Sequence, residues 1–225
     1  MSYFTQEFID FFINLEKNNN RDWFQANKKE YEKQVKKPFE IFVADLIKLI
    51  SKHDKTIQVL PKDCIFRIYR DIRFSEDKSP YKLNTSAIIG RQGRKGGSVP
   101  GTYVELSHQH FRIYGGCYMP EKQHLMDIRY EIANNPEEFK KLYTDKEFVK
   151  HFGELRGEKN KILPADLKEP ASTEAYIFNK QFYYFELFDP KILLKDDLMK
   201  TCEKAYFASK PLLDYLTKAG GYAEI

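Results

Sequence analysis

Cysteine is scarce in this sequence. The 225 residues include three, Cys64, Cys117 and Cys202, which lie far apart and form no Cys-x-x-Cys pair. This usage excludes a disulfide framework and a cysteine-rich zinc site, and it is typical of a reducing compartment. Hydrophobic runs are short too: none approaches the length of about 18 residues that a membrane span needs, and the start of the chain does not resemble a signal peptide. We therefore expect a cytoplasmic protein with no membrane partner.

The sequence also has little excess of one sign of charge over the other. Lys and Arg number 37 against 33 Asp and Glu, which gives a formal net charge of +4. This balance excludes a histone-like or wholly basic nucleic-acid coat, and equally an acidic disordered tail. With 42% hydrophobic residues, the composition is that of a globular protein. The chain is long enough to bury a core without covalent cross-links.

Short catalytic motifs are missing as well. The sequence contains no Gly-x-Ser-x-Gly elbow, and its basic, glycine-rich residues 91–97 have neither the spacing nor the terminal Lys-Ser/Thr of a P-loop. His108 and His110 form a His-x-His pair, but no third ligand stands at a spacing typical of zinc. We predict no metal and no cofactor. Catalytic residues, and whether the protein is an enzyme, are left open.

Helical periodicity is present at both ends of the chain. Phe8, Phe11, Phe12 and Leu15 recur at the spacing of one helix face, and a second helix begins near residue 22. Pro38 is best placed in the first turn of a third helix, because proline is tolerated there. The helical period returns after residue 120 and again in a last helix, whose start Asp196 or Asp197 can cap. The sequence therefore predicts helices on both sides of a different middle region.

The middle of the chain alternates between apolar and polar residues instead. Its short runs are rich in β-branched and aromatic residues and are bounded by Gly, Pro and Asn, which is typical of strands. These runs are residues 64–69, 85–89, 102–107, 110–118 and 180–187. Helices, then strands, then helices indicate an α+β fold. We predict a mostly antiparallel sheet of about five strands, flanked by N-terminal and C-terminal helices, in one domain over residues 1–225.

Two of these strands can be aligned in register. A turn at His108 and Gln109 makes residues 102–107 and 110–118 a hairpin. The apolar face then pairs Val104 with Ile113 and Leu106 with Phe111. The other face pairs Tyr103 with Tyr114, Glu105 with Arg112 and Ser107 with His110. One face is apolar, and the other is polar and ionisable.

The positive charge is concentrated between residues 65 and 97, which contain eight Lys and Arg residues but only three Asp and Glu residues. Residues 70–82, here called the 70–82 loop, connect two predicted strands. Arginine and lysine suit contacts with phosphate or carboxylate, and aspartates orient such cations. If the 64–69 strand lies beside the hairpin, Arg67 and Tyr69 join the polar face, which then combines rings and cations. The predicted ligand-binding residues are Arg67, Arg70, Asp71, Arg73, Asp77, Lys78, Lys82, Tyr103, Glu105, Arg112 and Tyr114.

A family resemblance covers most of the chain. Within the 70–82 loop, the run Arg-Asp-x-Arg-Phe-Ser-x-Asp-Lys-Ser-Pro-Tyr-Lys resembles the signature of a broad family of uncharacterised bacterial and fungal proteins, a domain of unknown function. Further matching residues are Trp23, Phe24, Tyr31, Gly115, Gly116, Arg129 and Pro211. The resemblance implies a single α+β domain. It implies no reaction, cofactor or catalytic residue.

Three functions agree with these residues. The first is a module that binds a phosphate-bearing small molecule or nucleic acid through the basic loop and the polar sheet face. The second is an enzyme for a phosphorylated or carboxylated small molecule, in which Arg70, Arg73 and Lys78 hold the substrate and Glu105 or Asp77 acts as the base. The third is a non-catalytic scaffold or protein-interaction domain, for which the ionic loop is architectural. We place the first hypothesis ahead of the other two.

Overall fold

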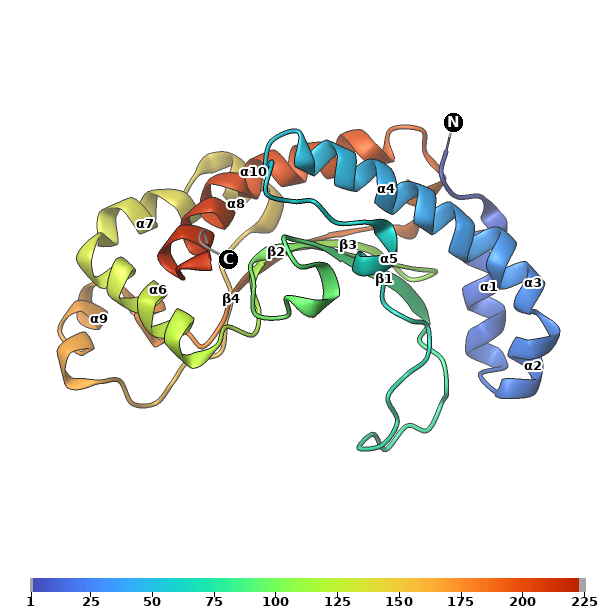
Figure 1. Ribbon diagram of the computed structural model, residues 1–225, viewed down its shortest axis with the longest axis horizontal. Helices are drawn as coiled ribbons and strands as arrows, with labels where there is room; N and C mark the ends of the chain where they lie inside the picture. The colour runs from blue at the N-terminus through green and yellow to red at the C-terminus, as the bar shows by residue number, and fades with distance from the viewer. Residues whose placement is uncertain (1, 223–225) are drawn as a thin grey trace.

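The computed structural model describes residues 2–222 and shows an α+β fold (Figure 1). Its sheet consists of β1 (Asn84–Ile89), β2 (Gly101–Ser107), β3 (Phe111–Cys117) and β4 (Phe182–Phe188). The α-helices are α1 (Gln6–Lys17), α2 (Arg21–Ala26), α3 (Lys28–Glu30), α4 (Lys37–Ser51), α5 (Pro61–Cys64), α6 (Lys122–Asn134), α7 (Pro136–Tyr143), α8 (Lys146–Phe152), α9 (Pro170–Thr173) and α10 (Leu198–Ala219). The other helical turns are η1 (Tyr31–Lys36), η2 (Gly93–Lys95), η3 (Ala165–Leu167), η4 (Ala175–Phe178) and η5 (Pro190–Leu194).

The four strands form an antiparallel sheet in the order β1-β2-β3-β4. Between β2 and β3 the register pairs Tyr103 with Tyr114 and Glu105 with Arg112, which confirms the predicted hairpin. The register follows from the strict alternation of apolar and polar residues, since a slip by one residue would expose the apolar side chains. The fold class predicted from the sequence is confirmed.

One face of the sheet packs against helices. Its apolar residues Val104, Leu106, Phe111 and Ile113 are buried, and Figure 1 shows α4 and α10 running over this face. The ring of Phe42 in α4 lies 6.5 Å from that of Phe111. These contacts form the main core, because each helix turns an apolar stripe towards the sheet.

The opposite face of the sheet, here called the open face, is half-exposed. Tyr103, Glu105, Arg112 and Tyr114 alternate with the buried residues of β2 and β3, so their side chains lie on this face. The next strand adds Tyr183 and Phe185, because Phe185 is the register partner of Tyr114. The open face therefore combines several rings with a few ionisable groups.

Residues 64–69 differ from the predicted strand. Ile65 forms an isolated bridge with Ala87, and the amide of Phe66 donates to the Ser86 carbonyl at 2.9 Å. From Ile68 onwards the chain bonds to its own return instead of to β1, because the amide of Lys82 donates to the carbonyl of Ile68. The alternation in this segment reflects an extended chain beside β1 that turns away after one bridge.

The 70–82 loop extends away from the helices and the sheet, as the teal to green segment before β1 shows (Figure 1). Tyr81 attaches its base to the N-terminal helices. The ring of Tyr81 is 1% exposed and stacks on Phe24 of α2 at 4.0 Å between centroids. The side-chain amide of Asn19 bonds to both backbone groups of Tyr81, at 2.9 and 3.1 Å. The base of the loop is therefore fixed, although its tip is exposed.

The N-terminal helices follow the predicted pattern. Pro38 lies in the first turn of α4, directly after the π-helical turn η1. The apolar stripe of α4 is buried from Phe39 to Ile50. Within residues 2–222, no helix is long and apolar enough to cross a lipid bilayer.

Candidate functional site

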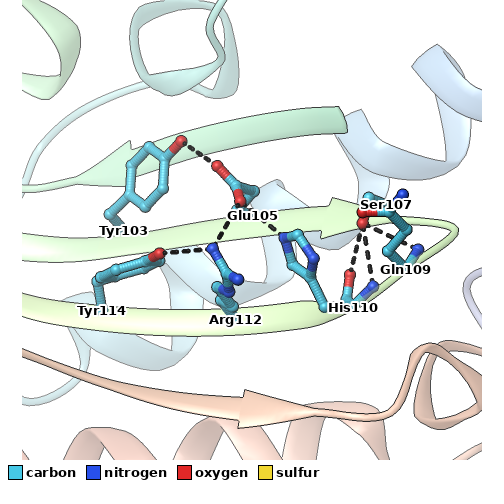
Figure 2. A network of polar contacts seen from close by, with 7 residues as sticks. All are labelled: Tyr103, Glu105, Ser107, Gln109, His110, Arg112 and Tyr114. Carbon is cyan, nitrogen blue, oxygen red and sulfur yellow. Dashed lines mark hydrogen bonds and ion pairs between the residues drawn. The ribbon is translucent and has the colours of Figure 1, made fainter. Parts of the chain in front are cut away.

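The predicted ligand-binding residues fall into two groups in space. Tyr103, Glu105, Arg112 and Tyr114 lie together on the open face, where Figure 2 shows them linked by polar contacts. Lys82 joins them at the edge of β1. The remaining residues, which lie on the 70–82 loop or beside its base, are Arg67, Arg70, Asp71, Arg73, Asp77 and Lys78.

Glu105 is the centre of the polar contacts on the open face (Figure 2). The Tyr103 hydroxyl donates to its Oε2 at 3.1 Å. Its Oε1 lies 2.8 Å from Nε2 of His110 and 3.7 Å from Nη1 of Arg112. The Arg112 Nη1 also donates to the Tyr114 hydroxyl at 3.2 Å. One carboxylate thus holds a tyrosine, a histidine and an arginine in fixed positions.

The polar contacts around Glu105 are partly buried, which strengthens them. The side chain of Glu105 is 17% exposed and that of His110 is 16% exposed. Burial is also the main reason that the pKa of Tyr103 is raised, and the neighbouring Glu105 carboxylate adds to the effect. The Tyr103 hydroxyl therefore stays protonated and serves as a hydrogen-bond donor. Because water is partly excluded, charged groups on this face interact more strongly than they would in solvent.

Lys82 places a cation at the edge of the same face. Its Nζ lies 5.4 Å from the ring centre of Phe66, whose ring is 6.0 Å from that of Tyr103. Burial lowers the pKa of the Lys82 ammonium group, the charge of Arg67 lowers it further, and Glu105 opposes both effects. Arg67 itself is exposed. Lys82 therefore connects the base of the 70–82 loop to the open face.

Rings follow one another across the open face. Tyr103 and Tyr114 are 5.5 Å apart between ring centres, and Tyr114 and Phe185 are 5.1 Å apart. With Phe66 beside Tyr103, the row crosses the sheet from the β1 edge to β4. A row of rings with cations beside it is suited to contacts with flat, negatively charged molecules.

A cavity of about 550 Å³ opens over part of this row. We call it the ring cavity. Its aromatic walls are Phe66, Tyr103, Tyr114, Tyr118 and Tyr183. Arg94 of η2 adds a cation to the wall, and α5 holds its side chain there, because its Nη2 donates to the carbonyl of Lys62 at 2.9 Å. The volume lies within the range of about 300–1,000 Å³ that small-molecule sites occupy.

Sequence reasoning missed several residues of the ring cavity. The alternation of residues 180–187 contained a signal for Tyr183, because it stands between the buried residues Phe182 and Tyr184. Phe66 lies beside Tyr103 on the open face, where Arg67 and Tyr69 were predicted to lie. Tyr69, predicted to join the polar face, packs instead on Tyr81 at 5.2 Å. The cause is the turn of residues 64–69 away from β1.

The charges of the 70–82 loop pair mainly with one another. The Arg70 guanidinium bonds to the Asp77 carboxylate, and Nη2 of Arg73 donates to Asp71 at 2.7 Å. Hydrogen bonds from Arg73 lower the pKa of Asp71 to about 2. The Lys78 ammonium donates to the carbonyl of Ile72 at 3.0 Å. These contacts shape the loop without assembling its cations around a common point.

Other reactive groups contribute little to a site. Cys64, Cys117 and Cys202 are buried as free thiols. Burial raises the pKa of all three, to about 11 for Cys64 and about 12 for Cys117, so the nucleophilic thiolate form is disfavoured. In the part of the chain that the structure describes, no three His, Cys, Asp or Glu side chains cluster as metal ligands would.

Fold and site together define an α+β protein with a ring-lined cavity on the open face of a four-stranded antiparallel sheet. The chain belongs to the conserved hypothetical protein family DUF2461, whose family model matches residues 7–215. This membership confirms the resemblance to a domain of unknown function. None of the curated proteins compared with the chain matches it. The family description names no activity.

Proposed function

We propose that this protein binds a small anion that carries a flat ring, of the nucleoside monophosphate type, in the ring cavity. The observation that carries the proposal is the composition of the cavity wall, in which five aromatic rings surround a space that also reaches Arg94. Rings recognise a base by stacking, and an arginine fork recognises phosphate oxygens. Lys82 and Arg112 supply further positive charge next to the rings.

Binding explains the open face better than acid–base catalysis does. A general base needs a free lone pair directed at the substrate, whereas both oxygens of Glu105 already face donors, the Tyr103 hydroxyl and the His110 ring. Glu105 then acts as the residue that orients Arg112 and Tyr103. A binding module is therefore favoured over an enzyme that uses Glu105 as its base.

The loop has a secondary place in this proposal. Arg70, Arg73 and Lys78 stay predicted ligand residues, but each already contacts an acceptor within the loop. A ligand there would have to replace those contacts. In the ring cavity, by contrast, five rings and Arg94 line one space, and Arg94 donates there to the backbone carbonyls of Lys62 and Asp63 and not to a carboxylate.

Calorimetric titration with adenosine monophosphate (AMP) tests the proposal, with adenosine and inorganic phosphate as separate titrants. AMP is expected to bind more tightly than either part. Tyr114→Ala removes one stacking ring, which is worth about 1–3 kcal/mol, so AMP affinity should fall about 5- to 150-fold. AMP binding that is unchanged in Tyr114→Ala would contradict the proposed site.

A second pair of variants tests the cation. Arg94→Gln and Lys95→Gln each remove one positive charge from neighbouring positions, but Arg94 alone of the two lines the ring cavity. AMP affinity should fall about tenfold or more in Arg94→Gln and change little in Lys95→Gln. A short single strand that binds with a steep salt dependence while AMP does not bind would replace the proposal by nucleic-acid binding.

A cytoplasmic location is part of the same proposal. It is supported by the three buried free thiols, which are typical of a reducing compartment.

A further inference from the structure

A second cavity, of about 230 Å³, lies between α10, the C-terminal end of α4 and the paired ends of β1 and β2. We call it the α10 cavity. It lies on the helix-covered side of the sheet, because Thr102 in its wall alternates along β2 with Tyr103, which faces the ring cavity. The two cavities are therefore separate spaces on opposite sides of β2.

Two hydroxyl groups in the wall of the α10 cavity have no partner and can be reached from the cavity. Tyr206 is 3% exposed and Thr102 is 4% exposed, and neither side-chain hydroxyl makes a hydrogen bond within residues 2–222. The small exposed part of each residue includes its hydroxyl oxygen, which is therefore not sealed off from water. Polar side chains in residues as buried as these are normally paired, so two that face one cavity indicate a ligand that bonds to them.

Tyr206 lies near two carboxylates of the same wall. Burial raises the pKa of Tyr206 to about 12, and the charges of Asp214 and Asp54 add to the effect, so the hydroxyl stays protonated and can donate. Asp214 is already paired with Lys210. Asp54 accepts from the amide of Thr56 at 3.0 Å through Oδ1, and its Oδ2 accepts no hydrogen bond within residues 2–222. A donor and a free acceptor in one wall match an alcohol group, which accepts one hydrogen bond and donates another.

Two cations lie at the end of the α10 cavity towards the C-terminus of α10. Arg91, from the basic, glycine-rich residues 91–97, is held there because its Nη1 donates to the carbonyl of Tyr222 at 2.7 Å. Its Nη2 is accessible and has no acceptor in the described part of the chain. Lys218 is exposed and forms no ion pair with another described residue. A planar fork and a point charge, both without an acid partner, are suited to a phosphate group.

The α10 cavity is long in relation to its volume. The residues that α10 contributes to it run from Tyr206 to Lys218, which is about 18 Å along the helix axis. Its volume lies below the range of about 300–1,000 Å³ that most small-molecule sites occupy, so its width is small. The two cations lie at one end of this stretch and Tyr206 at the other. A linear ligand with a phosphate at one end and hydroxyl groups along its length fits both the shape and the polar groups.

We propose that the α10 cavity binds a linear polyol that carries a phosphate, of the sugar-alcohol phosphate type. Its phosphate oxygens accept from Arg91 and Lys218. A hydroxyl group towards its other end accepts from Tyr206 and donates to Asp54, and a further hydroxyl bonds to Thr102. This site lies on the other side of β2 from the ring cavity, so the inference goes beyond the proposed function and does not rest on it.

Calorimetric titration of the full chain with glucitol 6-phosphate and with ribitol 5-phosphate tests the proposal. Glucitol, ribitol and inorganic phosphate are the separate titrants. At least one of the two phosphorylated polyols should bind about tenfold or more tightly than its polyol or phosphate alone, because only the joined molecule reaches both ends of the cavity. If neither binds more tightly than its parts, the proposal is overturned.

Two tyrosines of α10 test the hydroxyl contact. Tyr206→Phe keeps the buried ring and removes the hydroxyl that reaches the cavity, so the affinity for the phosphorylated polyol should fall about 3- to 10-fold. Tyr215→Phe is the matched control, because it removes a hydroxyl of the same helix that is sealed off from water, and it should leave the affinity unchanged. Equal affinities in the two variants would contradict the site.

Two lysines of α10 test the phosphate contact. Lys218→Gln should lower the affinity about fivefold or more, whereas Lys200→Gln removes an exposed charge outside the cavity and should change it little. An equal loss in both variants would show a general effect of charge and contradict the assignment of Lys218. Saturating AMP should not alter the affinity for the phosphorylated polyol, because the two cavities lie on opposite sides of β2. Competition by AMP would place the polyol in the ring cavity and overturn this site.

Discussion

The 70–82 loop and the open face of the sheet contain the same kinds of residue in different surroundings. In the loop, Arg73 and Asp71 form an ion pair whose side chains are 75% and 47% exposed. On the open face, Glu105 and His110 are less than one-fifth exposed and belong to a linked set of contacts. Exposed ion pairs contribute about 0–1 kcal/mol to stability. Charge density in the sequence therefore does not by itself locate a site, whereas partial burial beside rings does.

The largest expected effect concerns the base of the loop. Tyr81 and Phe74 are aromatic residues of the same loop, but Tyr81 is 1% exposed and Phe74 is 95% exposed. Tyr81→Ala should lower the free energy of unfolding by about 3–5 kcal/mol, because it removes a buried ring and leaves a cavity. Phe74→Ala should change it by less than about 0.5 kcal/mol. Urea unfolding measures both, and equal effects would contradict the division between a fixed base and an exposed tip.

A middle-sized effect is expected on the open face. Glu105→Ala leaves Arg112 and His110 without their shared carboxylate in a half-buried setting. The free energy of unfolding should fall by about 1–3 kcal/mol. Glu76→Ala, at an exposed position in the loop, is the matched control and should have almost no effect. Thermal unfolding measures both variants. An equal shift of the unfolding midpoint in the two would contradict a stabilising role for the contacts around Glu105.

A smaller effect is expected for the ion pairs of the loop. Arg73→Ala should lower the free energy of unfolding by no more than about 1 kcal/mol. In the same protein, AMP affinity should change less than about twofold, because Arg73 bonds to Asp71 and does not line the ring cavity. Calorimetric titration of Arg73→Ala beside the wild-type chain measures this. Loss of AMP binding would move the site from the sheet to the loop.

The smallest effect is a pH dependence within the loop. The pKa of Asp71 is lowered to about 2 by hydrogen bonds from Arg73. A carboxyl group with a lowered pKa stabilises the folded arrangement above its ordinary pKa, and this contribution is lost as the pH falls through about 2. Carbon NMR of the Asp71 carboxyl group should follow this titration. In Arg73→Ala the pKa should return towards the ordinary range of aspartate, and an unchanged value would exclude Arg73 as the cause.

The sequence predicts the parts of this fold that depend on local alternation. The register of β2 against β3 follows from residues 102–118 alone, because each apolar residue has to face the helices. Glu105 and Arg112 are neighbours for the same reason. The alternation of residues 64–69 led to an expected strand, yet it cannot reveal that the chain turns away from β1 after Phe66.

The cavities depend on contacts between distant segments. The ring cavity combines Phe66 before β1, Tyr118 after β3 and Tyr183 in β4, which no local pattern brings together. The same holds for Tyr81, whose backbone is held by Asn19 from another part of the chain. In the 70–82 loop the sequence shows the charges but not their pairing, since an arginine near an aspartate is equally compatible with a ligand site and with a local ion pair.

We expect the ligand to lie on the open face, next to Lys82, and residues 70–80 of the loop to make no contact with it. Backbone amide chemical shifts during titration with AMP distinguish these two locations. Shifts are expected at Tyr103, Tyr114 and Gly116, around the ring cavity, with little change between residues 70 and 80. Shifts confined to the loop, with the amides of β2 and β3 unmoved, would contradict it.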